Sequence, residues 1–128
     1  MSYESLVHLS KLEIDALVEL FLEVNALRKK GYFLTSRQEV PDSLSELRET
    51  LEIKEGESMK LIHEVATLIE EFSRLKKGEG QELISELPES SQGIIKKGLV
   101  RLSKSKAFIN YKVYNFYLIL LIRWSFTC

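Results

Sequence analysis

The last part of this chain, residues 90–128, contains no aspartate or glutamate. All 19 acidic residues lie between Glu4 and Glu89. Residues 90–128 carry seven of the 18 bases, whereas residues 1–89 carry 11 bases against 19 acids and a formal charge of −8. The overall charge of −1 therefore conceals two parts of opposite charge. Such segregation indicates recognition of a charged partner and is the strongest functional signal in the sequence.

Cysteine is almost absent, since Cys128 is the only one. A single cysteine excludes an intramolecular disulfide framework and a zinc site built from several cysteines. The chain therefore suits a reducing compartment. Its first residues, Met-Ser-Tyr-Glu-Ser, lack the basic and then apolar pattern of a signal peptide. We expect a cytoplasmic protein.

Proline, glycine and long apolar runs are also scarce. Two prolines and six glycines leave no room for a long low-complexity linker. The most apolar segment, residues 116–122, ends at Arg123, whereas a spanning helix needs about 20 predominantly apolar residues. We expect no transmembrane helix. The length predicts a single domain, 1–128, with an acidic body at 1–89 and a basic, aromatic-rich part at 90–128.

The spacing of apolar residues predicts an all-α fold. Leucines and other apolar residues recur every three or four positions, which is the period of a helix buried on one side. We expect a small helical bundle of two long helices and two or three short ones. The long helices are predicted at 3–30 and 58–77, and the short ones at about 44–53, 81–87 and 92–106. Ser43 with Glu46 has the pattern of a capping box.

The helix at residues 92–106 is the predicted binding element. Ser90 and Ser91 can cap it, and apolar positions at 95, 99 and 102 are expected to face inward. Steps of four and three place three bases on one outer face. Lysine and arginine on such a face suit nucleic-acid phosphates, with Ser103 and Ser105 as further hydrogen-bond donors. The predicted nucleic-acid-binding residues are Lys96, Lys97, Arg101, Lys104 and Lys106.

The segment 107–126 can be interpreted in two ways. Its aromatic and β-branched residues favour a strand, whereas its length and helical neighbours favour a helix. We expect a helix, with a strand as the alternative. A helical stripe of aromatic and leucine side chains is typical of a core or an oligomer interface. The predicted interface residues are Tyr114, Phe116, Tyr117, Leu120, Leu121 and Trp124.

Motifs for catalysis, metal binding and cofactor binding are incomplete. His63-Glu64 begins like the zinc-protease motif, but Thr67 stands where its second histidine is required. Gly93 and Gly98 have the spacing of phosphate-loop glycines, but the lysine that should follow them is missing. We therefore expect no enzyme, no metal, no cofactor and no small-molecule substrate.

These observations predict a non-enzymatic helical interaction or adaptor protein that forms a homo-oligomer. Its basic helix would contact DNA, RNA or an acidic protein surface, including residues 46–57 of the same or another subunit. The alternative is a peripheral protein on an anionic membrane surface, anchored by the aromatic C-terminal segment.

Overall fold

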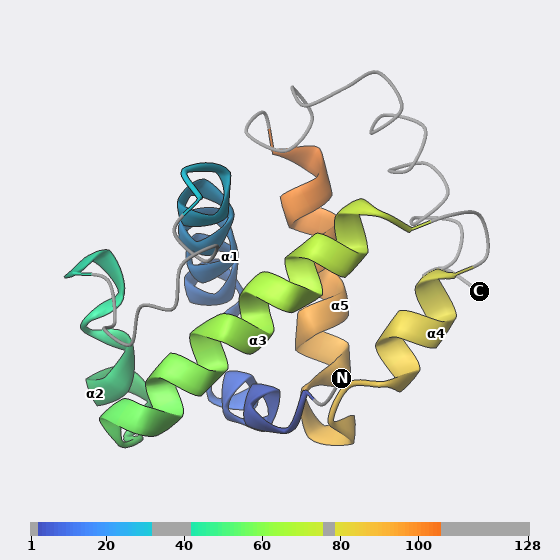
Figure 1. The fold of residues 1–128 in the computed structure, drawn as a ribbon. Coiled ribbons are helices and arrows are strands. Elements are labelled where there is room, and N and C mark those ends of the chain that lie inside the picture. Colours follow the sequence, from blue (N-terminus) through green and yellow to red (C-terminus); the bar gives the residue numbers. More distant parts are fainter. Residues whose placement is uncertain (1–2, 32–41, 76–78, 106–128) are drawn as a thin grey trace.

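The described residues of this computed structural model, 3–31, 42–75 and 79–105, form helices and contain no strand (Figure 1). The all-α prediction is confirmed. The choice between helix and strand at 107–126 lies outside the described residues. The elements, in chain order, are the 3₁₀ helix η1 (Glu4–Lys11), α1 (Ile14–Lys29), the 3₁₀ turn η3 (Asp42–Leu44), α2 (Leu47–Leu51), α3 (Glu55–Ser73), α4 (Gly80–Ser85) and α5 (Glu89–Lys104).

The prediction of one continuous helix over 3–30 is wrong. Leu12 and Glu13 are extended, with ψ angles of 148° and 158°, and they separate η1 from α1. Leu12 is buried and Glu13 is exposed. The chain therefore turns at Glu13, a polar residue that interrupts the series of leucines spaced three or four positions apart in residues 6–20. The break allows η1 and α1 to pack in different directions against α3 and α5. Within the described residues the long helices are α1, α3 and α5.

Two predicted helix caps are not formed. Glu46 is the N-cap of α2 and has helical backbone angles, and no side chain caps that end. The Ser43–Glu46 capping box is therefore absent. The helix α5 begins at Glu89 after Pro88, so Ser90 and Ser91 lie inside the helix rather than in front of it.

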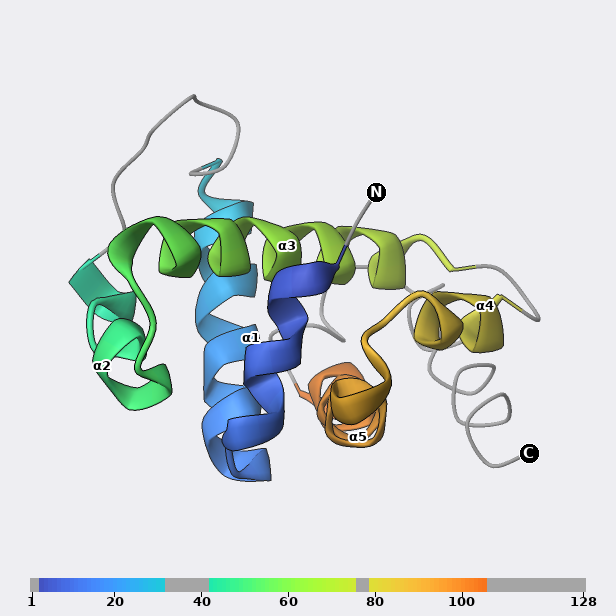
Figure 2. The ribbon, with the colours of Figure 1, turned by 90° about the horizontal axis from the view of Figure 1, so that it is seen from below.

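The three long helices cross one another instead of lying parallel. Figure 1 shows α1 nearly end-on and α3 passing in front of α5, and Figure 2 shows α5 end-on beneath α3. The helix η1 packs between α3 and α5, with Leu6 and Leu9 fully buried. The short helix α2 lies at one end of α3, and α4 lies near the other.

A buried carboxylate attaches η1 to α3. Glu64 of α3 is 6% exposed, and its Oε1 accepts the backbone N–H of Ser5 at 2.9 Å. Since helix N-termini carry unpaired N–H groups and partial positive charge, this carboxylate stabilises the first turn of η1. Tyr3 is buried beside it. Burial and the nearby Glu71 carboxylate raise the pKa of the Tyr3 hydroxyl above its ordinary value.

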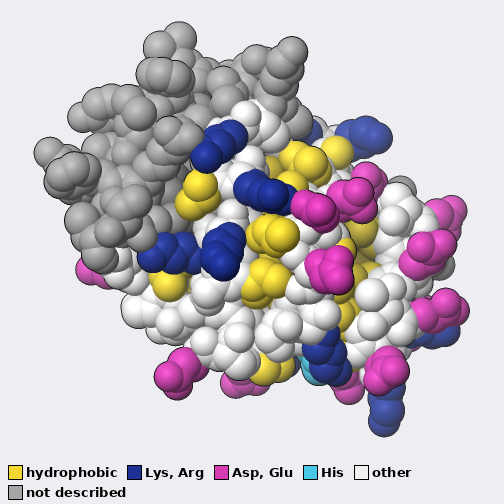
Figure 3. Space-filling view, turned by 180° about the vertical axis from the view of Figure 1, so that it is seen from behind, with side chains coloured by type: hydrophobic (Ala, Val, Ile, Leu, Met, Phe, Trp, Pro, Cys, Tyr) yellow, Lys and Arg dark blue, Asp and Glu magenta, His cyan; other side chains and the backbone are white. Residues whose placement is uncertain are grey.

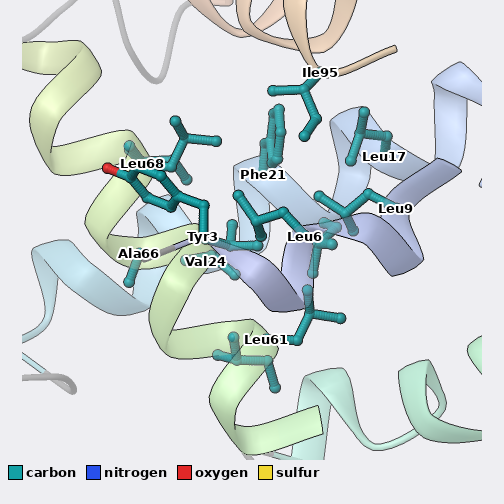
Figure 4. Packing of buried hydrophobic residues seen from close by; sticks show 14 of the residues in the cluster. Tyr3, Leu6, Leu9, Leu17, Phe21, Val24, Leu61, Ala66, Leu68 and Ile95 are labelled. Carbon is teal, nitrogen blue, oxygen red and sulfur yellow. The ribbon is translucent and has the colours of Figure 1, made fainter. Parts of the chain in front are cut away.

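Helices α5 and α1 approach each other closely at Gly98, where they cross. A Cβ atom at Gly98 would lie 2.9 Å from Phe21 Cε2 and 3.0 Å from Leu17 Cδ2. Both side chains are fully buried, and Figure 4 shows Phe21 directed towards Ile95 of α5 with Leu17 nearby. The crossing therefore leaves room only for glycine at position 98.

We predict opposite effects on stability for two glycine substitutions in α5. Gly98→Ala should lower the free energy of unfolding by about 1–3 kcal/mol, because the new methyl group overpacks the crossing. Gly93→Ala should raise it by about 0.5–1 kcal/mol, because nothing lies within 4 Å of a Cβ there and alanine favours helix. Urea unfolding followed by circular dichroism measures both. A Gly98→Ala protein as stable as Gly93→Ala would contradict the close crossing.

Candidate functional site

The helix α5 is buried on one side and basic on the other. The inward residues Ile95, Leu99 and Leu102 are 0% exposed, as their spacing predicted. Lys97, Arg101 and Lys104 are exposed on the opposite side. These three residues are called the α5 basic face below. No acidic residue follows Glu89, so no carboxylate of the described part of α5 interrupts this face.

The other predicted site residues do not join this face in the described part of the chain. Lys96 is half-buried at its edge and makes an interaction of its own. Lys106 lies outside the described residues, and so does the whole predicted oligomer interface: Tyr114, Phe116, Tyr117, Leu120, Leu121 and Trp124.

The two serines predicted to donate to phosphate are engaged elsewhere. Ser103 is 0% exposed, and its hydroxyl donates to the Val100 carbonyl at 2.6 Å. The Ser105 hydroxyl donates to the Leu102 carbonyl at 2.9 Å. Both bonds turn the hydroxyl back onto its own helix, which is a common local arrangement for serine. The prediction for Ser103 is wrong because this position lies on the buried side of α5.

An acidic residue from α1 approaches the α5 basic face. Arg101 Nη1 donates to Asp15 Oδ1 at 2.5 Å, and the two side chains are 51% and 83% exposed. An exposed pair of this kind contributes less than about 1 kcal/mol to stability. Asp15 nevertheless neutralises part of the positive charge on the face. The two residues are 86 positions apart, so no local sequence signal identifies the pair.

Acidic side chains gather at the other end of the molecule, around α2 and the start of α3. This end lies away from α5 in both ribbon views (Figures 1 and 2). In Figure 3 a group of basic side chains lies beside the grey region, and acidic side chains lie mainly towards the opposite edge. The exposed charges of residues 42–57 are Asp42, Glu46, Glu49, Glu52, Glu55 and Glu57, against Arg48 and Lys54.

A groove of about 490 Å³ runs between α1 and the η3–α2 segment. Its floor is mainly leucine, and three carboxylates stand among the residues that line it. We call this the acidic groove. It is lined by the apolar residues Leu12, Ala16, Leu20, Leu22, Leu44 and Leu47 together with Ser43, Thr50, Glu19, Glu23 and Glu46. The sequence analysis missed it, because its two walls come from segments at least 20 residues apart.

The histidines do not form a metal centre within the described ranges. His8 Nε2 lies 3.7 Å from Glu57 Oε2, and His63 is half-buried on α3. Among residues 3–31, 42–75 and 79–105, no three His, Cys, Asp or Glu side chains gather closely enough to hold a metal ion. In the same ranges, no helix combines the length and the apolar character needed to cross a bilayer.

Comparison of the chain with protein families, with curated proteins and with solved structures gives no match.

The Asp15–Arg101 pair leads to a prediction about anion binding. If the α5 basic face binds polyanions, Asp15→Asn should strengthen binding of a short labelled DNA duplex about two- to fivefold, because an exposed ion pair contributes less than about 1 kcal/mol. Asp42→Asn removes the same charge at the acidic end and should leave the affinity unchanged. Fluorescence anisotropy at low salt measures both. Equal strengthening by both variants would show that net charge, rather than the α5 basic face, governs binding.

Proposed function

We propose that the protein is a non-enzymatic interaction protein that binds nucleic acid through the α5 basic face. The observation that supports this is the placement of Lys97, Arg101 and Lys104. All three are exposed on the outer side of a helix whose inner side belongs to the core. The helix is therefore held rigidly, and its cations are presented together to the solvent.

The spacing of the three cations suits a phosphate backbone. Residues 97 and 104 are separated by about 10 Å along the helix axis, at about 1.5 Å per residue. The face therefore presents three cations to one stretch of backbone, enough to neutralise about three phosphates. Each contact releases condensed counterions, which favours binding at low salt.

The chemistry of the face favours binding that does not depend on base sequence. Lysine and arginine contacts to phosphate position a protein on nucleic acid but carry no sequence information. Non-specific binding of this kind has dissociation constants of about 10⁻⁴–10⁻⁶ M at physiological salt. The acidic end of the molecule would be repelled by phosphate, so the opposed charges orient the protein with α5 towards the backbone.

Two other predictions remain proposals. The homo-oligomer interface at residues 114–124 lies outside the described residues. The membrane alternative relies on the same bases, because anionic lipid headgroups also attract lysine and arginine. Vesicles containing phosphatidylserine therefore serve as a second probe beside DNA in the experiment below.

The direct test reverses the charge of the face. The triple variant Lys97→Glu, Arg101→Glu and Lys104→Glu should bind a DNA duplex at least tenfold more weakly. The plot of log K against log salt has a negative slope, and this slope should become less steep by about 3, since each lost phosphate contact contributes about 0.9. Anisotropy across a salt series measures both quantities.

The matched control is Lys30→Glu, Lys54→Glu and Lys60→Glu, which makes the same change in net charge at exposed positions away from the face. It should retain most of the affinity, and circular dichroism should show that both variants keep their helices. Equal losses in the two variants would contradict the proposal. Binding to the vesicles but not to DNA would favour the membrane alternative.

A further inference from the structure

The acidic groove and the α5 basic face are complementary in charge and lie on different parts of the molecule. We propose that the acidic groove of one copy of this chain binds the α5 basic face of a second copy. This inference uses the same face as the proposed function, but it does not require that the face bind nucleic acid.

The chemistry of the groove fits long basic side chains. Lysine and arginine carry an apolar stem and a charged end, and they bury the stem along apolar surface while the charge remains near polar groups. Ala16, which is exposed, and Leu22, which is half-buried, offer the apolar surface above the buried leucines of the floor. Glu19, Glu23 and Glu46 offer carboxylates for charge-assisted hydrogen bonds to the ammonium and guanidinium groups.

The spacing of charges on the two surfaces also matches. Glu19 and Glu23 are four residues apart on α1, which places them about 6 Å apart along its axis. Lys97 and Arg101 are four residues apart on α5 and have the same separation. Two helices side by side can therefore pair both carboxylates with both cations. Glu46, on the α2 wall of the groove, is then available to Lys104.

In one chain α1 lies between the acidic groove and most of the α5 basic face, although Asp15, one turn before Glu19, reaches Arg101. Leu17 and Phe21 are the α1 residues that contact α5 at its crossing. Glu19 and Glu23 each follow one of these residues by two positions, which places them about 200° around the helix. The groove thus lies on the opposite side of α1 from α5. The prediction that the basic helix pairs with the acidic region of its own subunit has no support from this arrangement.

A contact between two different surfaces is heterologous, and it generates rings or open chains of subunits instead of a single closed dimer. The average mass should therefore rise with protein concentration beyond the mass of a dimer. It should also depend on salt, because the contact is largely electrostatic and the Debye length falls to about 3 Å at 1 M salt. Nucleic acid bound to the α5 basic face would compete with the second copy.

Sedimentation velocity of two charge-reversed variants and of their mixture tests the contact. The groove variant carries Glu19→Lys, Glu23→Lys and Glu46→Lys, and the α5 variant carries Lys97→Glu, Arg101→Glu and Lys104→Glu. At low salt the wild-type protein should associate, and each variant alone should be monomeric. An equimolar mixture should associate again, because the reversed groove of one variant is complementary to the reversed α5 face of the other.

The control Glu57→Lys, Glu82→Lys and Glu86→Lys changes net charge equally at exposed positions outside the groove and should associate like the wild type. If the groove variant loses its cooperative thermal transition, a variant with glutamine at positions 19, 23 and 46 replaces it and should associate more weakly than the wild type.

Three results would overturn the inference: a monomeric wild type at low salt, a groove variant that associates normally, or a mixture that stays monomeric. The same experiments distinguish a failure of this inference from a failure of the proposed function. A wild type that binds DNA but stays monomeric refutes only the groove contact. A wild type that associates through the groove but does not bind DNA refutes only the nucleic-acid proposal.

Discussion

The charges that the protein presents on α5 depend on the crossing of α1 and α5 at Gly98. Because position 98 has no side chain, Leu17 and Phe21 pack directly against α5. That contact fixes the rotation of α5 about its own axis. It places Ile95, Leu99 and Leu102 in the core and leaves the α5 basic face in solvent. A packing constraint between two apolar surfaces therefore decides which charges the protein presents.

The same helix α1 keeps the opposite charges apart. One side of α1 packs against α5, and the other lines the acidic groove with Glu19 and Glu23. The acidic groove and the α5 basic face are thus two separate surfaces of the described residues, and Asp15 reaches across to Arg101. These two surfaces are the ones that we propose contact a polyanion and a second copy of the chain.

Periodicity in the sequence predicted the helices and the two sides of α5, because both depend on spacings of three and four residues within one element. Contacts between distant segments could not be predicted in this way. The Asp15–Arg101 pair, the Ser5–Glu64 hydrogen bond and the acidic groove each join residues far apart in the chain. The break before α1 had a local signal: Glu13 interrupts the leucine stripe, but a single polar position is not enough to predict a turn.

The most direct test of the account is to map the contact of a DNA duplex on isotope-labelled protein by NMR chemical-shift perturbation. The account predicts that the perturbed signals lie on α5 around Lys97, Arg101 and Lys104, and that α2 and the start of α3 are unaffected. Perturbations centred on Lys29 and Lys30 at the end of α1, or on α2, with α5 unchanged, would contradict it.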